Sequence, residues 1–514
     1  MNISSWDGRL SIQLSNALKI SIFLIISVCL SACGLWNKTK QPADVVAVYS
    51  LFAPASNGGN ENGEPVLYAR AVLNSLGAAC PILTGSDQST VKMSERGFHP
   101  DRTNFPVTVC EAMISVGVSY RVSNSEFELA AATLAPSEVL VYGDTGCKAS
   151  VCKPGEAASP FSKLAKAGAT RGAELILHMG DYNYRGTSGS LKKKPEKIYA
   201  YDAGDGGYDG ASCGYVGTPY YSQNASDSSK PDQWQYWYED FFLPAQELLT
   251  TAPWVFARGN HELCSRAGVG WFYFFGPGSS LEGGISQLVC PNQGSIARPA
   301  YNAVNSINMI QPYVVSLEPL DLWVMDSANA CDASSDNPLT SEFTQQFEQL
   351  QAQLPSNDKP VWMLTHRPTW GAEIDTSQST PTAVSSLNVM LQTALKQSEG
   401  AAFASQVQLL LSGHMHLYQD ISFPGSTRPP QIVIGNSGVS LNKSTTGNYQ
   451  GTIDGKAAQV NQLDEFGYLL MSLKEQGQWQ GEVLNEGGQV LVRCDSKNAN
   501  TNQGLCVIDS TSSN

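Results

Sequence analysis

The chain is 514 residues long, with a hydrophobic share of 42%, 46 glycines and 27 prolines. These proportions exclude a wholly disordered chain and predict a large catalytic domain, at least one smaller unit and many loops. The formal net charge of -14 disfavours broad contact with nucleic acid or anionic lipid, so we expect no nucleic acid as a stable partner.

The N-terminus has the pattern of an export signal. An apolar run over residues 20–30 follows a basic residue and is long enough for a signal-peptide core but short for a membrane span. It ends in LSAC at residues 30–33, which resembles a bacterial lipobox. We therefore expect a lipoprotein signal peptide over 1–33, a linker over 34–44 and a membrane anchor at a lipidated Cys33, on the outer membrane or cell surface or in the periplasm. An ordinary cleaved signal peptide and an uncleaved anchor are the alternatives.

The cysteines favour disulfides. Of the twelve cysteines, setting aside Cys29 in the signal and Cys33 leaves ten, an even number in an oxidising compartment. A zinc cluster is less well supported because no CxxC pair occurs. Spacing does not determine connectivity, so pairing by proximity is a hypothesis. The pairs expected on that basis are Cys80–Cys110, Cys147–Cys152, Cys264–Cys290, Cys494–Cys506 and Cys213–Cys331.

The rest of the chain divides by its hydrophobic pattern. Short apolar runs between turn-rich segments predict a small β-rich domain over residues 45–135. Apolar strands then alternate with helical segments over 136–495, which is typical of an α/β core, and 496–514 is expected to be a C-terminal tail. Further β structure is expected from residue 431. Strands are expected at 139–142, 174–179, 253–257, 320–325, 360–364 and 407–411, and helices at 160–168, 233–250, 341–354 and 383–397.

Residues 185–230 form an insertion rich in Gly, Asp, Tyr and Ser, without a regular period. Long loops inside a compact domain are usually functional or mobile, so this one is a candidate lid. Its Asp202, Asp205 and Asp209 match no calcium-loop spacing, and solvated aspartates are therefore favoured over a calcium site.

Five strands end in short polar clusters. The carboxyl ends of strands form the ligand crevice of open α/β folds, so we expect one shared site. The clusters are GDTG at 143–146, GDYNY at 180–184, GNHE at 259–262, THRP at 365–368 and GHMH at 413–416.

In this order, the five clusters resemble the metal-binding motifs of the calcineurin-like metallophosphoesterases, and more narrowly those of the purple acid phosphatases. The surrounding residues resemble a bacterial, lipoprotein-like branch of that superfamily. The resemblance covers residues 139–438 and implies an α/β fold, a four-layer α/β/β/α metallophosphoesterase sandwich with the small N-terminal β domain beside it.

The residue types fit a metal centre. Carboxylate, phenolate, amide oxygen and imidazole groups suit hard or borderline ions, and four of the six histidines fall inside the motifs. Carried over by position, the resemblance implies a first metal held by Asp144, Asp181, Tyr184 and His416. It implies a second metal held by Asp181, Asn260, His366 and His414, with Asp181 as the bridge.

Gly146 and Tyr184 narrow the resemblance. Many relatives have a histidine two residues after the first aspartate, where this chain has Gly146, and here a tyrosine stands three residues after the second aspartate. This exchange is the purple acid phosphatase pattern. Three anionic ligands favour Fe(III) in the first site, with Zn, Mn or Fe(II) in the second. A loop tyrosine that packs on the insertion is the alternative for Tyr184.

Residues beside the ligands have expectations of their own. His261 resembles the family histidine that contacts substrate and protonates the leaving oxygen. Glu262 is expected to be a structural anchor. Arg367 contacts phosphate or forms a salt bridge elsewhere. His178 is expected on the other face of its strand or behind the ligands, and therefore outside the site.

The resemblance implies hydrolysis of a phosphate-ester substrate, most simply by an acid phosphatase-type phosphomonoesterase in which a metal-bound hydroxide attacks phosphorus in line. A phosphodiesterase or nucleotide hydrolase on the same centre, and a surface lipoprotein that only binds, are the alternatives. Plant enzymes of this type have further substrate histidines after the fourth motif, and this chain has none between His366 and His414. Substrate preference and an acid optimum therefore do not carry over, and the oligomeric state stays open.

Overall fold

A computed structural model describes the chain between residues 44 and 509, with gaps. The expected signal peptide with Cys33, and the insertion after Arg185 with its three aspartates, lie outside the described residues. Within the described ranges, every helix is too short or too polar to cross a membrane. These ranges are 44–54, 65–97, 99–100, 102–148, 152–153, 155, 157–185, 232–262, 267–277, 310–332, 335, 339–354, 358–377, 379–398 and 402–509.

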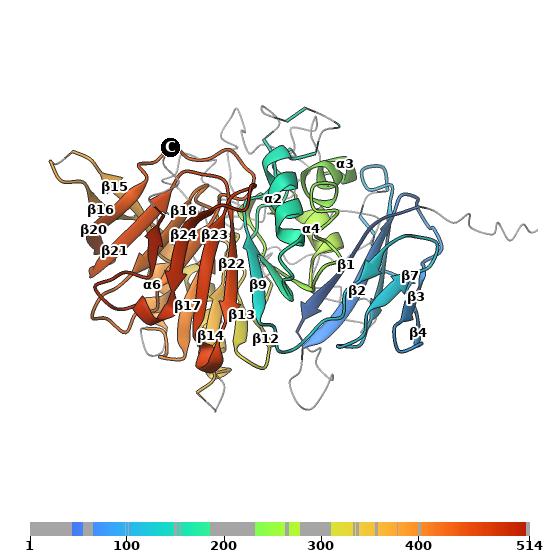
Figure 1. Ribbon diagram of the computed structural model, residues 1–514, viewed down its shortest axis with the longest axis horizontal. Helices are drawn as coiled ribbons and strands as arrows, with labels where there is room; N and C mark the ends of the chain where they lie inside the picture. Colours follow the sequence, from blue (N-terminus) through green and yellow to red (C-terminus); the bar gives the residue numbers. More distant parts are fainter. Residues whose placement is uncertain are drawn as a thin grey trace, which may run out of the picture. The chain divides into compact units, whose positions relative to one another are not determined.

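A mixed sheet carries the first three motifs (Figure 1). Its centre is parallel, with β9, β10 and β11 side by side and β1 beyond β11, while antiparallel strands flank both sides. Over the described residues its eleven strands are, in order across the sheet, β25 (Cys506–Ile508), β24 (Val490–Asp495), β23 (Trp479–Leu484), β22 (Tyr468–Leu473), β9 (Glu138–Tyr142), β10 (Leu175–His178), β11 (Trp254–Phe256), β1 (Val45–Ala53), β2 (Val66–Leu73), β6 (Thr108–Met113) and β5 (Ser94–Glu95).

A second mixed sheet carries the last two motifs. Its parallel centre is β13, β14, β17 and β19. The ten strands found in the described ranges are, in order, β12 (Tyr313–Ser316), β13 (Asp321–Val324), β14 (Val361–Leu364), β17 (Val407–Ser412), β19 (Gln431–Ile434), β18 (Tyr418–Ser422), β21 (Lys456–Leu463), β20 (Gly447–Ile453), β16 (Thr382–Leu387) and β15 (Gly371–Asp375). The motif-bearing strands are thus shared between two sheets.

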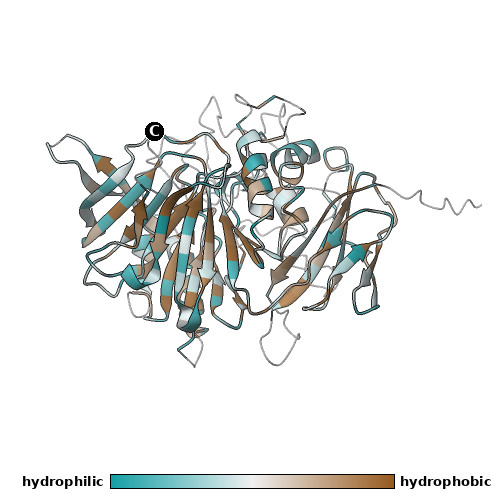
Figure 2. Ribbon diagram, viewed as in Figure 1, coloured by the Kyte–Doolittle hydropathy of each residue, from teal (hydrophilic) through white to brown (hydrophobic). Residues whose placement is uncertain are grey.

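The two sheets pack against each other through alternate side chains. Because neighbouring residues of a strand face opposite sides, β14 contributes to two cores. Its Trp362 meets Trp479 of β23 in the first sheet, with ring centroids 6.2 Å apart. Its Val361 and Met363 lie in a separate core with α5 (Leu339–Ala352) and α6 (Val389–Gln397). The central strands of both sheets are predominantly hydrophobic, as this burial requires (Figure 2).

Helix α2 (Ser159–Ala169) covers the other face of the first sheet. Phe161 packs against Tyr142 of β9, with ring centroids 5.8 Å apart, and the Tyr142 hydroxyl donates to the carbonyl of Leu164. Gly168 permits this approach, since a Cβ there would lie 1.8 Å from the Tyr142 hydroxyl oxygen. The helices α3 (Trp234–Trp237) and α4 (Gly268–Phe274) lie near α2 in Figure 1 and bury aromatic side chains in the same core.

The expected small β domain is continuous with the central sheet. β1 pairs in parallel with β11 through Leu51 and Trp254, and β2 and β6 extend the sheet beyond β1. Only β4 (Thr90–Lys92), β3 (Ile82–Gly85), β7 (Tyr120–Val122) and β8 (Glu128–Leu129) form a separate small sheet within the described ranges. Residues 43–514 accordingly form one compact unit. The remaining domain boundaries stay predictions.

Two expected helices and the expected tail differ from the structure. The expected helix at 233–250 is the short α3, a π-helical turn over Tyr238–Phe242 and then turns. The first part of 383–397 is strand β16, because it pairs with β15 and β20, and α6 begins only after Asn388, whose side chain accepts from the amide of Leu391. The segment 496–514 adds β25 to the edge of the first sheet. Helices near 160–168 and 341–354 are confirmed as α2 and α5.

Three of the five expected disulfides are confirmed: Cys80–Cys110, Cys147–Cys152 and Cys494–Cys506. Cys331 is also disulfide-bonded, and its expected partner Cys213 lies outside the described residues. The pair Cys264–Cys290 lies outside them as well.

Candidate metal centre

The motif loops have an unusual backbone. Asp144, Asp181 and His414 adopt left-handed conformations, with φ of 56°, 61° and 76°. For residues other than glycine this conformation costs about 1–3 kcal/mol each and persists where the surroundings enforce it. The His414 amide donates to Asp144 Oδ2 at 2.8 Å, and the His261 amide donates to Asp181 Oδ1 at 2.8 Å. The first hydrogen bond joins motif loops of the two sheets, and the second joins two motif loops of the first sheet.

Gly180 explains how closely these loops approach. Its φ is 97°, and a Cβ there would lie 2.6 Å from His366 Nδ1 and 2.8 Å from Gly259 Cα. Both the dihedral angle and the space therefore require glycine before Asp181.

The first ligand group meets at the hydroxyl of Tyr184. The Tyr184 hydroxyl oxygen lies 2.9 Å from Asp144 Oδ1, 2.9 Å from Asp181 Oδ2 and 3.0 Å from His416 Nε2. Asp144, Asp181 and His416 offer ligand atoms that all lie within 4.8 Å of one another. Two carboxylates, a phenol and an imidazole therefore surround one point.

The second ligand group meets at the amide oxygen of Asn260. This Oδ1 lies 2.9 Å from His366 Nε2 and 2.8 Å from His414 Nδ1, and His366 Nε2 is 3.4 Å from Asp181 Oδ2. Asp181, His366 and His414 form the second set of candidate metal ligands. Asp181 belongs to both groups, as a bridging residue must. The structure therefore brings all seven predicted ligands together.

Hydrogen bonds determine which imidazole nitrogens face the centre. His366 Nδ1 lies 2.7 Å from the carbonyl oxygen of Met179, so Nδ1–H donates there and Nε2 keeps its lone pair toward Asn260. His414 has the opposite arrangement, since its Nε2 lies 3.0 Å from Asp332 Oδ2 and its Nδ1 faces Asn260. Both rings are thus oriented to bind a cation through a free nitrogen.

Gly146 and Tyr184 depend on each other. A Cβ at Gly146 would lie 2.7 Å from Cδ2 of Tyr184 and 2.6 Å from the carbonyl oxygen of Tyr182. A side chain such as histidine at position 146 would therefore collide with Tyr184 where it now sits. The exchange seen in the sequence has a steric cause.

The pKa shifts of the ligand side chains favour a bound cation. Burial raises the pKa of Asp144 well above its usual range; His366 opposes the rise and Asp181 adds to it. Burial also opposes ionisation of Asp181, but His366 and His261 outweigh it and hold the pKa of Asp181 well below its usual value. Burial lowers the pKa of His416 to about 3. The protein alone does not hold both carboxylates ionised, and a bound cation reverses this balance.

Glu262 anchors the second motif loop, as expected. Its carboxylate accepts from the main-chain amides of Gly259 at 3.1 Å, Asp181 at 2.9 Å, Tyr182 at 2.9 Å and Asn183 at 3.3 Å. The side chain is fully buried. Glu262 therefore ties the GNHE motif to the loop that presents Asp181.

Two supporting residues were missed by sequence reasoning. Asp240 accepts from the Tyr184 amide at 2.9 Å and is paired with the buried Arg185, so it holds the tyrosine loop in place. Asp332 accepts from Arg367 and contacts His414. Neither aspartate lies in a motif or at a regular distance from one. The only signal was the location of Asp332 shortly after a predicted strand.

The other expected neighbours are resolved as follows. His261 packs against Tyr184 with the rings tilted by 39° and their centroids 3.8 Å apart, and its Nε2 is 4.0 Å from Asp181 Oδ2. Its side chain is 17% exposed, so it borders the centre from the solvent side. His178 is buried behind the ligands, with Nε2 2.9 Å from Thr145 Oγ1. Arg367 forms the expected salt bridge, to Asp332, and its side chain is fully buried.

Comparisons with known proteins found a matching family and similar solved structures. The profile of the family described as calcineurin-like phosphoesterase matches residues 137–418, more than half of the chain and a span that contains all seven predicted ligands. Among solved structures, the chain is similar to purple acid phosphatase PPD1 isolated from yellow lupin (Lupinus luteus) seeds, with a TM-score of 0.45 and 14% identity over 83% of this chain and 71% of that one. No curated protein matches the chain. On the family match, the chain belongs to the calcineurin-like phosphoesterases, a family of hydrolases.

Proposed function

We propose that the chain is a metal-dependent phosphoric ester hydrolase that acts as a phosphomonoesterase of the purple acid phosphatase type. The observation that carries the proposal is the position of the Tyr184 hydroxyl, 2.9 Å from carboxylate oxygens of both Asp144 and Asp181. The single O–H of the phenol can donate to only one of the two carboxylates at a time, and its deprotonation between them is opposed in the metal-free protein. Burial and both carboxylates raise the pKa of Tyr184 well above its usual value. A trivalent cation would stabilise the phenolate.

The donor set supports two different metals. The first group has two carboxylates, a phenol and one imidazole, which suits Fe(III). The second shares Asp181 and adds an amide oxygen and two imidazoles, which suits Zn, Mn or Fe(II). When bound, such a pair supplies charge neutralisation for the phosphate and a water of lowered pKa.

His261 is the proposed proton donor. It packs against Tyr184 beside Asp181, and it lies at the exposed border of the centre. From there it would donate a proton to the oxygen of the departing alcohol. The loop that carries His261 is held by Glu262, whose carboxylate accepts a hydrogen bond from the Gly259 amide.

Hydrolysis of p-nitrophenyl phosphate and of bis(p-nitrophenyl) phosphate by the metal-loaded protein tests the reaction. We expect the monoester to be the better substrate and Asn260→Ala to abolish its hydrolysis. A preference for the diester would replace the monoesterase with a phosphodiesterase on the same centre. Equal, background-level hydrolysis by the wild type and Asn260→Ala would refute an enzymatic role and leave a binding lipoprotein.

The chain's place in the cell is a separate part of the proposal. The LSAC sequence supports a lipid anchor at Cys33 of a bacterial lipoprotein, facing the periplasm or the cell surface. Three disulfides in the described residues support an oxidising compartment. Cys33→Ala should move the protein from the membrane to the soluble fraction, and an unchanged membrane fraction would contradict the anchor.

The packing of the sheets also supports the four-layer order. Trp362 contacts the first sheet while Val361 and Met363 contact α5 and α6, and Phe161 of α2 covers the outer face of β9. These contacts support an α/β/β/α order of the layers.

A further inference from the structure

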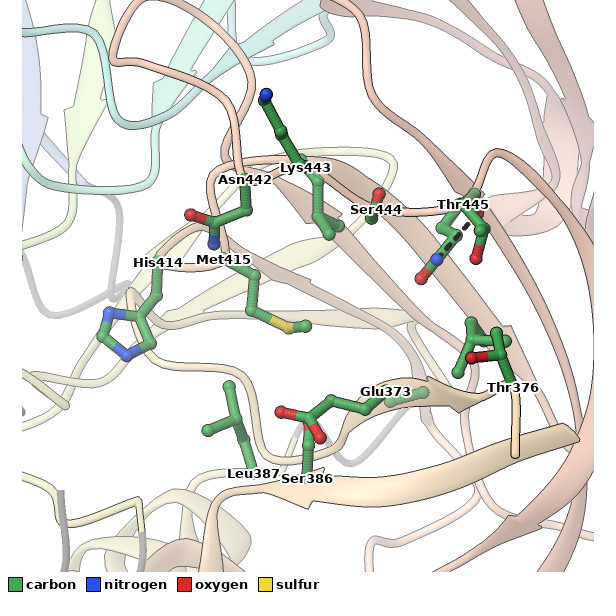
Figure 3. A pocket seen from close by; sticks show the side chains of 14 residues that line it. Glu373, Thr376, Ser386, Leu387, His414, Met415, Asn442, Lys443, Ser444 and Thr445 are labelled. Carbon is green, nitrogen blue, oxygen red and sulfur yellow. Dashed lines mark hydrogen bonds between the residues drawn. The ribbon is translucent and has the colours of Figure 1, made fainter. Parts of the chain in front are cut away.

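A pocket of about 760 Å³ opens beside the second ligand group. Figure 3 shows His414 at one end of it, Thr376 and Thr445 at the other, and Met415 between them. One wall is the hairpin of β15 and β16, which follows the THRP motif, and the opposite wall is the segment 442–445. Pockets of this size bind ligands considerably larger than a phosphate ion.

The pocket walls are tied to the metal motifs. The Asn442 amide donates to the carbonyl of His416 at 2.9 Å, which links the 442–445 wall to the fifth motif. The hairpin is held at Ala372, whose amide donates to Gln419 Oε1 at 2.9 Å and whose carbonyl accepts from Gln419 Nε2 at 3.0 Å. Gln462 closes the far end by donating to the Thr445 carbonyl at 2.8 Å. The pocket is therefore preformed and has a constant position relative to the metal ligands.

The lining combines an apolar face with many polar groups. Leu387 and Met415 form part of the apolar face, and Gly371 leaves room for them, since a Cβ there would lie 3.0 Å from Leu387 Cβ and 3.1 Å from Met415 Sδ. The hydroxyl oxygens of Ser386 and Ser444 are buried and have no hydrogen-bond partner within the described chain. Because these two oxygens are not accessible from the pocket, the polar groups available to a ligand are those of the exposed lining residues, which include Glu373, Asn442 and Lys443.

Glu373 is the one acidic residue of the lining, and Lys443 on the opposite wall is the one basic residue. Both are exposed, and neither forms an ion pair in the part of the chain that the structure describes. In Figure 3 the Glu373 carboxylate lies beside Leu387 and Ser386, on the side of the pocket that faces Met415. A free carboxylate in this place accepts hydrogen bonds from hydroxyl groups.

We propose that this pocket binds the alcohol part of the substrate and selects phosphomonoesters of ring-shaped, hydroxyl-bearing alcohols, namely sugar phosphates or nucleoside monophosphates. The proposal deepens and rests on the phosphomonoesterase function above. A phosphate held at the metal centre has its ester oxygen directed away from the cations, and the pocket begins at His414, a ligand of the second group. A ring of this kind offers an apolar face to Met415 and Leu387 and hydroxyl groups to the exposed Glu373 carboxylate.

Two other classes of alcohol fit less well. A lipid chain would cover the Glu373 carboxylate and the side-chain amide of Asn442 without offering either of them a hydrogen-bond partner, which is unfavourable. A substrate with several phosphates would bring further negative charge beside Glu373, with Lys443 as the single cation of the lining to balance it.

The test compares esters on the metal-loaded, full-length protein. Hydrolysis of p-nitrophenyl phosphate first establishes that the centre is active. The kcat/KM is then measured for a hexose phosphate, a ribonucleoside monophosphate, the deoxy or dideoxy counterpart of each, a long-chain alkyl phosphate and a nucleoside triphosphate. We expect one or both hydroxyl-bearing monoesters to exceed the alkyl phosphate and the triphosphate, and the better of the two identifies the source of the ring.

Glu373→Gln tests the contact itself, with Glu348→Gln on the exposed face of α5 as the matched control. Loss of a charged hydrogen-bond acceptor should raise KM for the hydroxyl-bearing ester about tenfold with a smaller change in kcat. Removing hydroxyls from the substrate should raise KM of the wild type by a similar factor. It should raise KM of Glu373→Gln little further, because the two changes remove the same contact. Inhibition of p-nitrophenyl phosphate hydrolysis by each ester gives the same comparison without requiring turnover of the ester.

The outcomes separate the two proposals. Active hydrolysis of p-nitrophenyl phosphate with no preference for hydroxyl-bearing esters would overturn the pocket assignment and leave the phosphomonoesterase intact. Equal behaviour of Glu373→Gln and Glu348→Gln would also overturn it. Absence of hydrolysis of every ester by the metal-loaded wild type would overturn the function on which the pocket assignment rests.

Discussion

The two halves of the metal centre differ in charge and in the way they are supported. Around the shared Asp181, the first half adds a carboxylate, a phenol and an imidazole, whereas the second adds an amide and two imidazoles. Tyr184 in the first half is held through its main chain, by Asp240. The imidazoles of the second half are oriented through their side chains, by the Met179 carbonyl and by Asp332.

One shared residue can therefore join two ligand groups of different charge whose other ligands are held by different residues. The anionic half is suited to a cation of higher charge, and the neutral half to a divalent one. Since Asp240 contacts only the first half and Asp332 only the second, substitution of Asp332 should affect one half, whereas substitution of Asp181 should affect both. The predictions below test that division.

The largest effect is expected for Asp181→Asn. Loss of the shared carboxylate should remove both metals. Because the metals supply several kcal/mol of transition-state stabilisation, kcat/KM should fall on the order of a thousandfold. Elemental analysis and p-nitrophenyl phosphate hydrolysis measure the two effects. Asp87→Asn, in an exposed turn of the small sheet, is the control. Retention of both metals by Asp181→Asn would break the picture of a bridged centre.

Tyr184→Phe should affect the first half alone. Loss of a direct ligand should weaken metal binding at the first site by about a hundredfold or more, while one metal per chain remains at the second. If iron occupies the first site, a visible tyrosinate-to-Fe(III) absorption band should disappear with it. Tyr449→Phe, on β20, should keep both the band and the metal content. A colourless and fully active wild type loaded with Zn or Mn would refute the iron assignment.

Asp332→Asn should affect the second half alone, and less strongly. Substitution of a residue that orients a ligating histidine typically costs 10–100-fold, so we expect metal affinity at the second site to fall about tenfold. An unchanged absorption band at the first site distinguishes this loss from general unfolding. The substitution also weakens the ion pair of the buried Arg367, and the melting temperature measures any loss of stability that results. Simultaneous loss of both metals would show that the halves are not independent.

Asp420 is a buried carboxylate outside the metal centre, and its ionisation should affect stability rather than metal binding. Burial raises its pKa from an ordinary value of 3.8 to about 7, against hydrogen bonds from Asn461 and Tyr418. The folded state therefore binds more protons than the unfolded state, and the associated stability is present below pH 3.8 and is lost as pH rises through about 7. Asp420→Asn should remove this decline, on the order of a few kcal/mol. Urea denaturation at several pH values measures it, and parallel declines in both proteins would contradict the assignment.

The predicted ligands, which the structure brings close together, could be identified from the sequence because they follow strands directly. Asp144, Asp181 and Asn260 stand one or a few residues after β9, β10 and β11, so local spacing was enough to identify them. The steric dependence of Tyr184 on Gly146 was visible only as a correlated pair of residues. Asp240 and Asp332 were missed because they act on ligands that are 56 and 82 residues away in the chain. No local pattern records such contacts.

The same distinction applies to the secondary structure: elements set by local sequence were predicted, and elements set by contacts with distant segments were not. Helix α2 has an apolar stripe and was correctly predicted, while β16 was mistaken for helix because its strand character comes from pairing with β15 and β20. The N-terminal strands were recognised as β structure, but not their continuity with the central sheet, which depends on pairing of Leu51 with Trp254.

From the sequence alone we could predict which groups are candidate metal ligands and the order in which the strands present them. Those properties reside in side-chain identity and short spacing. The tertiary structure decided that the motifs come from two sheets, that Asp181 lies in both ligand groups, and that a pocket lined by Glu373 and Met415 opens beside His414. These depend on which strands pair and how the sheets pack, because burial and hydrogen bonding between distant segments select among arrangements that local sequence leaves equivalent.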